Sequence, residues 1–466
     1  MRSSWAMVAV MLGVAPAGCA VGPDYKRPDT PAGKQESFRG QAAEAKSLGD
    51  LPFWEVFHDE ALKGLIQEAL SKSPSVQVAA ARVEQARGLA RADGWALAPS
   101  LTANAVGMRQ RAPVGPGVIA TFNTFTPSIA ASWEIDLWGR LRRTQEASYQ
   151  AFMASEEAQR GVMVALVGDV AQAYFLLRAL DAQRAIAEQR IASRTKALQL
   201  FQARLDRGTG NRAEVATATA QVMDARAQLA DIERRRRVAE NQLSVLTGSP
   251  PRQLPRGATL EAQVMPPVPA GLPSALLERR PDLRQAEAQL HAETARVGAA
   301  QANLFPKLSL TAALGLASPA LGTLASAQAA TWSFGGALNW LAPFLGREQL
   351  MAAVDIQKGR AAEVGAQYFA VVLNALREVD DALSALELVG QQVEAIEAQV
   401  KAVMEQRTLA ESRYQSGVTS FLEVTTAEEA VLPAQLSLEN ARAARLTALV
   451  SLYRALGGGW KVPETR

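Results

Sequence analysis

The sequence contains few of the side chains that usually build disulfides, metal centres or catalytic triads. Cys19 is its only cysteine, so no disulfide can form within the chain, and His58 and His291 are its only histidines. The two histidines fall at different points of the internal repeat described below, which gives little support to a two-histidine metal site or a histidine-based triad. No glycine-rich phosphate loop follows a predicted strand. We therefore expect a protein that is not an enzyme and that holds no cofactor or metal.

Aromatic side chains and excess charge are also scarce. Aromatic residues make up 6% of the 466 residues, although hydrophobic residues reach 48% and many of these are alanines. This composition suits long, closely packed helices better than a thick globular core. The net charge is only +3, and both signs are mixed along the chain. Because a nucleic-acid-binding face needs a concentrated basic surface, no nucleic-acid partner is expected.

The N-terminus has the pattern of a secretory signal peptide that ends before Cys19. A charged start is followed by an apolar run at 5–15, which is too short to span a bilayer as a helix. Small residues ending in Gly18 resemble a lipoprotein processing site, at which Cys19 would become the acylated N-terminus. Such sites usually carry an aliphatic residue three positions before the cysteine, where this chain has Pro16. Ordinary cleavage beside an incidental cysteine is therefore the alternative.

The mature chain consists of two similar halves. A displacement of 207 positions relates three motifs: Ser73-Pro74-Ser75 to Arg280-Pro281-Asp282, Pro99-Ser100-Leu101 to Pro306-Lys307-Leu308, and Trp138-Gly139-Arg140 to Leu345-Gly346-Arg347. A displacement of 209 relates later residues: Arg204 to Arg413, Gly208 to Gly417, and Glu214 to Glu423. Between the halves, 249–273 carries seven prolines in 25 residues, a composition that is typical of an extended connector.

The repeat predicts six segments along the chain. They are a signal peptide (1–18), a lipid-anchored extended segment (19–57), a first repeat (58–248), the proline-rich connector (249–273), a second repeat (274–458) and a C-terminal tail (459–466). Each repeat is expected to contain a helix, two strands, a very long helix, a tight turn and a return helix. In the first repeat we expect strands at 99–111 and 124–138, the long helix at 140–206 and the return helix at 211–247. The corresponding elements of the second repeat are expected at 306–316, 330–341, 347–415 and 420–456.

The predicted strands alternate between apolar and polar residues. Their apolar positions are Ile129, Ala131, Trp133, Ile135, Leu137, Leu308, Leu310, Ala312, Leu314, Leu316, Trp332, Phe334, Gly336, Leu338 and Trp340. Strands of about ten residues with one apolar face and aromatic residues near their ends are typical of an outer-membrane barrel. Glycine-, alanine- and proline-rich loops are expected at 112–123 and 317–330. A half-buried sheet of a soluble protein has the same period and is the alternative.

The membrane interpretation requires more than one chain. We expect no stretch of the mature chain that is apolar enough for a transmembrane helix, so a membrane would be crossed by strands. Four strands cannot close a barrel, and open strand edges are not tolerated in lipid. At least two chains must therefore contribute strands to one barrel.

The long helices contain no proline over 67 and 69 residues, which predicts a length of about 100 Å each. Gly208 and Gly417 can take the left-handed conformation that ends a helix, and capping boxes are expected at 211–214 and 420–423. A turn at the far end of such helices is a natural place to meet a partner, and a plain helix hairpin is the alternative. The residues expected to dock an adaptor are Arg204, Leu205, Asp206, Arg207, Gly208, Thr209, Gly210, Arg413, Tyr414, Gln415, Ser416, Gly417, Val418 and Thr419.

Acidic residues near these tips suggest a gate. Glu405, Glu411 and Asp206 are close in sequence to arginines of the same helices. If several chains converged there, rings of carboxylates would favour cations and could pair with arginines to close the entrance. Surface pairing between residues four positions apart is the alternative.

Several motifs together resemble the TolC-like outer-membrane factors, in particular their NodT-type lipoprotein branch. The motifs are Cys19-Ala20-Val21-Gly22-Pro23-Asp24-Tyr25-Lys26-Arg27-Pro28, Trp54–Phe57 followed by Asp59 and Leu62, Ala131–Arg140, and Arg413-Tyr414-Gln415-Ser416-Gly417. The resemblance covers nearly the whole chain. It implies a lipid-anchored homotrimer of the cell outer membrane, with four strands per chain in a twelve-stranded barrel and a long periplasmic α-helical barrel. It also implies contact with a periplasmic membrane-fusion adaptor and an inner-membrane pump of the RND type, and no catalysis.

On this interpretation the chain is the outer-membrane channel subunit of a tripartite efflux system. It would be a passive conduit for drugs or other small molecules. Channels for type I protein secretion and for metal-cation efflux share the architecture, so these cargoes remain alternatives. A lipid-anchored periplasmic helical scaffold without a pore is the alternative from another class.

Overall fold

The structure is a computed structural model that describes residues 20–35, 37–38, 47–51, 53–263, 265–266, 268–269, 271, 273–340 and 346–458. Cys19, the predicted signal peptide and the predicted C-terminal tail lie outside the described residues. The chain forms two compact units. The first comprises Met1–Pro28, Arg82–Glu156 and Gln285–Phe369, and the second comprises Asp29–Ala81, Glu157–Arg284 and Ala370–Arg466.

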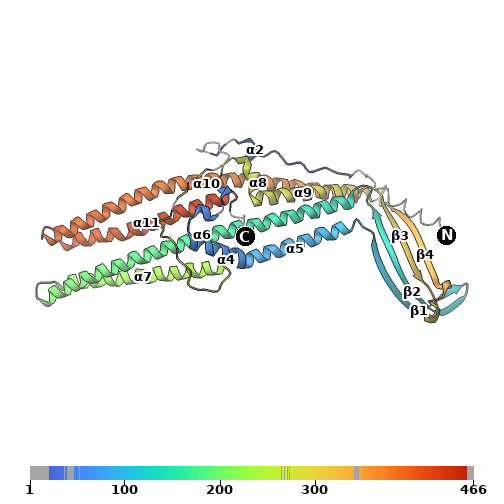
Figure 1. Cartoon of the computed structure of the whole chain (residues 1–466), viewed down its shortest axis with the longest axis horizontal. Coiled ribbons are helices and arrows are strands. Elements are labelled where there is room, and N and C mark those ends of the chain that lie inside the picture. Colours follow the sequence, from blue (N-terminus) through green and yellow to red (C-terminus); the bar gives the residue numbers. More distant parts are fainter. Residues whose placement is uncertain are drawn as a thin grey trace. The chain divides into compact units, whose positions relative to one another are not determined.

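The chain is mainly α-helical with one small sheet, as the sequence predicts. The long helices α6 (Arg140–Asp206) and α10 (Arg347–Gln415) have the bounds expected from the proline-free segments. The return helices α7 (Arg212–Leu246) and α11 (Phe421–Ala455) are one residue shorter at each end than expected. Figure 1 shows α7 running back alongside α6, and α11 alongside α10.

Shorter helices and helical turns surround the long ones. They are α2 (Pro31–Lys34), η1 (Leu48–Asp50), α3 (Phe53–Val56), α4 (Glu60–Lys72), α5 (Pro74–Trp95), η2 (Pro273–Ala275), α8 (Leu276–Arg279), α9 (Pro281–Ala302), η3 (Leu321–Thr323) and η4 (Ala327–Ala329). We expected the segment 19–57 to be extended, but it contains the short helices α2, η1 and α3. Pro31 occupies the first turn of α2, where its fixed φ favours a helical start, and the Ser47 side chain caps η1.

The four strands form a single antiparallel sheet within the first unit. Its order is β1-β2-β3-β4, so the hairpins of the two repeats join between β2 and β3. The strands are β1 (Ser100–Gly115), β2 (Val118–Ile135), β3 (Lys307–Leu316) and β4 (Ala330–Asn339), and Figure 1 shows them side by side. Strands β1 and β4 lie at the two ends of this order, so each has one edge without a partner strand in the described chain.

The loop expected at 112–123 is instead the end of a continuous hairpin. Strand β1 extends to Gly115, which pairs with Val118 at the start of β2. The turn needs only Pro116 and Gly117, and Gly117 has a φ of +74°. Proline followed by a glycine with positive φ is what a type II turn requires. Pro116 and Gly117 therefore suffice for the turn. The residues on both sides of it pair in the β1–β2 ladder, which satisfies their backbone hydrogen-bonding groups.

Strand β2 ends at Ile135 rather than at residue 138, because the side chain of the next residue, Asp136, caps the start of helix α6. The Asp136 carboxylate accepts hydrogen bonds from the backbone N–H groups of Leu141 and Arg142, at 3.0 and 2.9 Å. It thereby satisfies donors that the first turn of α6 leaves unpaired. Asp136 and Leu137, which we expected on the two faces of the strand, belong instead to the connection between β2 and α6.

Helix α6 contains, among the described residues, the one window long and apolar enough to cross a membrane as a helix. Our expectation that the mature chain has no such stretch is therefore wrong. Half of that window is buried, and Tyr174, Phe175 and Leu177 of α6 are fully buried in the second unit. The Tyr174 hydroxyl also donates a hydrogen bond of 2.9 Å to the buried Asp59 carboxylate, which caps α4. Core packing within that unit explains the apolar character of α6.

Candidate channel wall and docking tips

One face of the sheet is apolar along β3, β4 and the adjoining parts of β1 (up to Gly107) and β2 (from Phe125). Toward the β1–β2 turn the same face becomes polar, with Arg109, Arg111, Thr121 and Asn123. Trp133 lies directly opposite Leu310, which lies opposite Gly336, and opposed residues of an antiparallel sheet share a face. The large apolar side chains that are exposed on this apolar face are Leu101, Ile129, Trp133, Leu314, Trp332, Phe334 and Leu338. Trp332 is 80% exposed and Leu314 is 72% exposed in the single chain. A continuous apolar surface of this kind requires lipid or another protein to cover it.

The opposite face of the sheet carries mainly small and polar side chains. Its polar members include Thr102, Asn104, Ser128, Ser132, Ser309, Thr311, Ser333 and Asn339. Near the end of β2, Glu134 on this face forms an ion pair of 2.8 Å with Arg140, the first residue of α6. The sheet is therefore amphipathic across its thickness.

Two tryptophans make the same bond in the two repeats. The Trp133 indole N–H donates to the Leu97 carbonyl at 3.0 Å, and the Trp340 indole N–H donates to the Leu304 carbonyl at 3.1 Å. Each bond ties a strand end to the segment that follows the preceding helix, α5 or α9. Indole rings with an apolar body and a bonded N–H are typical of the interface between membrane and water.

Both hairpin tips end their long helices in the same way. Gly208 and Gly417 have φ of +76° and +74°, the left-handed conformation that the sequence predicts. The residue after each glycine closes the turn: Thr209 N–H donates to the Arg204 carbonyl at 3.0 Å, and Val418 N–H donates to the Arg413 carbonyl at 2.9 Å. These are the bonds of a Schellman motif, which satisfies carbonyls at a helix end. The predicted tip residues thus form two well-defined turns of similar shape.

The two tips restart differently. Asn211 and Glu214 form the predicted capping box at the start of α7. The capping box predicted for Ser420 is absent, because the Ser420 side chain makes no capping hydrogen bond. The carboxylate of Glu423 is instead engaged by the Arg413 guanidinium at 3.1 Å and by the Thr419 hydroxyl. Glu423, which the capping box would require, is thus bound to Arg413 on the other side of the turn.

The tips of one chain also contact each other. The Arg204 guanidinium donates a hydrogen bond of 2.8 Å to the Tyr414 hydroxyl and lies over the same ring. The rings of Phe201 and Phe421 meet edge to face, with centroids 4.5 Å apart. The sequence did not predict these contacts, because each pair joins different repeats.

Two of the three residues proposed for a gate, Glu411 and Asp206, have local partners in the single chain. Glu411 forms an ion pair of 3.3 Å with Arg407 of the same helix, four residues away. The Asp206 carboxylate accepts a hydrogen bond of 2.9 Å from Gln202, also four residues away. These are the surface pairs that we considered as the alternative to a gate. Arg204 and Arg413, which are close in sequence to Asp206 and Glu411, bind Tyr414 and Glu423 instead.

A buried ion pair that the sequence did not reveal joins the two hairpins. Arg194 of α6 lies 2.5 Å from the Glu428 carboxylate of α11 and also donates to the Gln221 amide oxygen at 2.6 Å. The Arg194 side chain is only 3% exposed. Burial raises the pKa of Glu428, although Arg194 opposes that shift, and burial lowers the pKa of Arg194. The pair therefore stabilises the contact only while both partners are present.

The segment directly after Cys19 is held on the helices of the first unit. The Asp24 carboxylate accepts a hydrogen bond of 2.6 Å from Arg143 of α6, whose side chain is buried. This hydrogen bond, together with the positive charge of Arg143, lowers the pKa of Asp24. Residues 20–28 belong to the motif that resembles the lipoprotein branch, but the sequence gave no indication of what they bind.

A second set of contacts fixes the same segment on α9. The Tyr25 ring stacks on the His291 ring with centroids 4.5 Å apart. Arg27 forms a bidentate pair with Glu287, with distances of 2.7 and 2.8 Å. His291, one of the two histidines of the chain, therefore has a structural environment and is not part of a metal cluster among the described residues.

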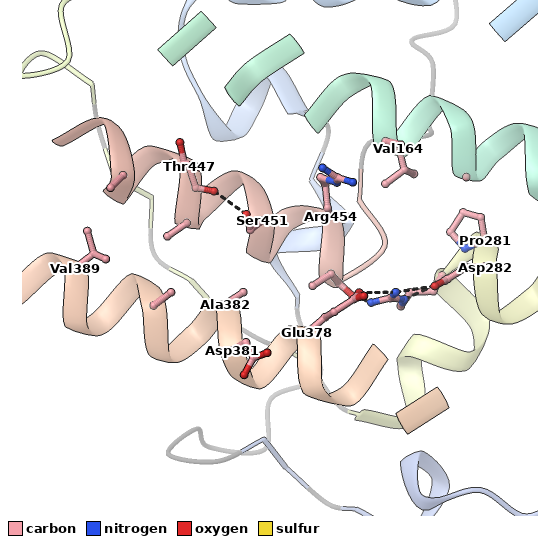
Figure 2. Close-up of a pocket in the computed structure, with 17 residues that line it drawn as sticks. Val164, Pro281, Asp282, Glu378, Asp381, Ala382, Val389, Thr447, Ser451 and Arg454 are labelled. Atoms are coloured by element: carbon pink, nitrogen blue, oxygen red, sulfur yellow. Dashed lines mark hydrogen bonds and ion pairs between the residues drawn. The ribbon is translucent and has the colours of Figure 1, made fainter. Parts of the chain in front are cut away.

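A cavity of about 680 Å³ lies in the second unit, where α9 begins and α11 ends. Figure 2 shows Glu378 and Asp282 at one end of it and Val389 at the other. The buried Arg280 guanidinium closes the first end by bonding both of those carboxylates and the Ala455 carbonyl of α11. We assign no binding role to this cavity, because each of its charged groups already has a partner: Arg280 binds Asp282 and Glu378, Asp381 pairs with Arg377, and Arg454 pairs with Asp169.

An amphipathic four-stranded sheet with an apolar face, joined to helix hairpins whose long helices have 67 and 69 residues, defines a class of outer-membrane channel subunits. The model of the outer membrane efflux protein family matches residues 65–249 and 272–458, so it covers both repeats. The chain belongs to the outer membrane efflux protein family.

Named relatives support this assignment. The chain is 35% identical over 456 residues to the solvent efflux pump outer membrane protein SrpC of Pseudomonas putida, covering 96% of this chain and 97% of the relative. It is 33% identical over 448 residues to the cation efflux system protein CusC of Escherichia coli O6:H1, covering 95% and 96%. The open-state MtrE outer-membrane channel of Neisseria gonorrhoeae superposes with a TM-score of 0.86 at 31% identity, covering 95% and 99%. A CusC crystal structure superposes with a TM-score of 0.84 at 32% identity, covering 95% and 100%.

Proposed function

We propose that three copies of this chain form one channel through the outer membrane, with twelve strands in the barrel wall. The observation that carries the proposal is the sheet itself. It combines an exposed apolar face with strand edges on β1 and β4 that have no partner strand in the described chain. Unpaired edges are costly in lipid, so β4 of one copy would pair with β1 of the next until the barrel closes. Cys19 would carry the lipid anchor at the start of the mature chain.

In this assembly the apolar face contacts lipid and the opposite face lines the lumen. Trp133, Ile135, Leu310 and Trp340 would face lipid, while Glu134, Ser309 and Asn339 would face water. The polar members of the second face are compatible with a water-filled interior. Trp133 and Trp340, bonded to the carbonyls at the ends of the helical segments, would mark the periplasmic surface of the membrane.

The hairpin tips would dock a periplasmic adaptor protein that connects the channel to an inner-membrane pump of the RND type. Both tips have a defined backbone, but their side chains differ, so a trimer would present six tips of two alternating kinds. The two sets of contacts with the adaptor should therefore not be equivalent. The gate assigned to Glu405, Glu411 and Asp206 would form only where three chains converge.

The channel would act as a passive conduit without catalysis, exporting drugs or other small molecules. A conduit need not bind its cargo tightly, so metal-cation efflux and type I protein secretion are the competing cargoes. Relatives are named for both solvent and cation efflux. A helical scaffold without a pore is the alternative from another class.

The test of cargo is export in cells. A strain that lacks this chain, but retains its adaptor and pump, should lose resistance to organic solvents and antibiotics and regain it with the wild-type gene. A loss of copper or silver tolerance alone would assign the channel to metal cations, and loss of an exported protein alone would assign it to protein secretion. Unchanged tolerance and secretion would contradict an export function.

A further inference from the structure

A cavity of about 640 Å³ lies in the first unit between α5 and α6, close to the start of β1. Its volume is within the range of roughly 300–1,000 Å³ that is usual for small-molecule sites. The residues that give it its chemical character are Arg87, Arg91, Trp95, Gln145, Tyr149 and Phe152. We call this site the arginine–aromatic pocket.

Two arginines and no aspartate or glutamate line the pocket. Arg87 lies over the Phe152 ring at 5.4 Å and is paired with Glu84 at 2.6 Å and with Glu156 at 3.8 Å. The positive charge that the pocket offers to a ligand is therefore that of Arg91. Arg91 is exposed and forms no hydrogen bond or ion pair with any residue that the structure describes, and the same is true of the Gln145 amide group. A guanidinium and an amide N–H₂ group are therefore available to an anion at the same cavity.

One end of the pocket, at Leu97, adjoins the apolar face of the sheet. Leu97 lines the pocket, and its carbonyl accepts the hydrogen bond from the Trp133 indole, which belongs to the apolar face. Trp95 also lines the pocket and is 76% exposed. A ligand with an anionic head and an apolar tail could therefore place its head at Arg91 and its tail along Trp95 and Trp133.

The internal repeat shows that the fold itself does not require these side chains. The positions 207 residues later hold Thr294 and Gly298 in place of Arg87 and Arg91, and Ile356 and Gly359 in place of Tyr149 and Phe152. The corresponding helices of the second repeat, α9 and α10, thus form without the two arginines and the two aromatic rings. A ligand, rather than helix packing, gives a reason for the combination in the first repeat.

We propose that the arginine–aromatic pocket binds the phosphate of an anionic phospholipid from the membrane leaflet at the periplasmic end of the sheet. The inference rests on the proposed function, because it needs the apolar face to lie in the membrane. Arg91 and Gln145 bind the phosphate oxygens, and the acyl chains follow Trp95 and Trp133 onto the apolar face. Arginine suits the phosphate group, and tryptophan and tyrosine suit the interface between lipid and water. Each chain provides one such site.

The experiment is native mass spectrometry of the detergent-purified oligomer during titration with phosphatidylglycerol. The key variant is Arg91→Ala. The matched control is Arg82→Ala, which removes an exposed arginine from the same helix outside the pocket. The wild type and Arg82→Ala should bind one phosphatidylglycerol per chain with equal affinity. Arg91→Ala should bind at least about tenfold more weakly, because a charge-assisted hydrogen bond is lost, and Arg91→Lys should lie between them.

Two further ligands identify what the pocket recognises. Phosphatidylcholine, which has no net charge, should bind more weakly than phosphatidylglycerol. Soluble glycerol phosphate should not displace the lipid at equal concentration, because it lacks the acyl chains. Equal binding of phosphatidylcholine, or displacement by glycerol phosphate, would contradict the assignment to an anionic membrane lipid.

Oligomer formation and channel conductance separate this inference from the proposed function. Arg91→Ala should remain trimeric and conduct like the wild type. Loss of the trimer in Arg91→Ala would show that the pocket is a contact with a second copy, which overturns the inference. Unchanged lipid binding in a conducting Arg91→Ala trimer would also overturn it and leave the channel intact. A wild-type protein without conductance would overturn the proposed channel itself.

Discussion

Arg194 of the first repeat and Glu428 of the second form a buried ion pair with an N–O distance of 2.5 Å. Removal of one partner from a buried pair leaves an uncompensated charge and typically costs about 3–5 kcal/mol. We expect Glu428→Ala and Arg194→Ala each to destabilise the contact between the α6/α7 and α10/α11 hairpins by about 3 kcal/mol. The double variant should lose less than the sum of the two. Hydrogen–deuterium exchange of the α11 amides measures the effect, and strictly additive losses would contradict a direct pair.

The register of the sheet predicts opposite effects for neighbouring residues. Leu310 is on the apolar face and Ser309 is on the polar face. An arginine on a lipid-facing strand near mid-membrane costs roughly 2–4 kcal/mol. Leu310→Arg should therefore reduce the amount of heat-stable oligomer in the outer membrane much more than Ser309→Arg does. Equal amounts would show that the two faces have been assigned wrongly, since a shift by one residue exchanges them.

The glycines at the tips predict a substitution pattern that depends on backbone conformation and not on space. A Cβ atom at Gly208 or Gly417 would meet no atom within 4 Å, so any penalty comes from positive φ. Valine at Gly417 should cost about 1–2 kcal/mol locally and weaken export, whereas asparagine, which tolerates this conformation, should retain more function. Crosslinking to the adaptor and export are measured together. Full export with both glycines replaced by valine would place docking elsewhere.

The N-terminal segment should detach from the first unit in acid. The pKa of Asp24 is lowered by Arg143, so its contribution to stability is present above the ordinary value of 3.8 and is lost as the pH falls through the lower folded value. A nitroxide attached through Lys26→Cys reports the mobility of the segment by electron paramagnetic resonance. We expect an immobile label at neutral pH and increasing mobility below pH 3.8.

Asp24→Asn is the control for this transition. It removes the charge that Arg143 binds, so the label should already be more mobile at neutral pH and should change less on acidification. A label that behaves identically in the wild type and in Asp24→Asn would show that this ion pair does not hold the segment.

The gate is tested by ion selectivity. If Glu405 and Glu411 of three chains form acidic rings, their replacement by alanine should reduce the preference for cations and raise the conductance of the closed state. Bilayer recordings of the wild type, the single variants and the double variant provide the measurement. Wild-type conductance and selectivity in all variants would leave only the local pairing with Arg407.

The features that the sequence predicted well are those fixed by local chemistry. A proline-free segment of 67 residues and a glycine in the left-handed conformation determine where α6 ends, whatever packs against it. Strand alternation also determined which residues share a face of the sheet. The hairpin turn at Pro116 and Gly117 was missed because turn-forming residues were assigned to a longer loop.

The features that the sequence could not supply depend on contacts between distant segments. Arg194 and Glu428 belong to different repeats, so neither repeat alone contains a signal for their pairing. Ser420 has the sequence of a capping residue, but Arg413 binds the glutamate on which the capping box depends. The ion pair between Asp24 and Arg143 likewise joins residues that are far apart in the chain.

The measurement that tests the central claim most directly is the single-channel conductance of the purified wild-type oligomer in planar lipid bilayers. We predict uniform conductance steps from a trimer, with Leu310→Arg giving few insertions and Ser309→Arg inserting normally. A folded, membrane-inserted oligomer that produces no conductance steps would contradict the assignment of this chain as a channel.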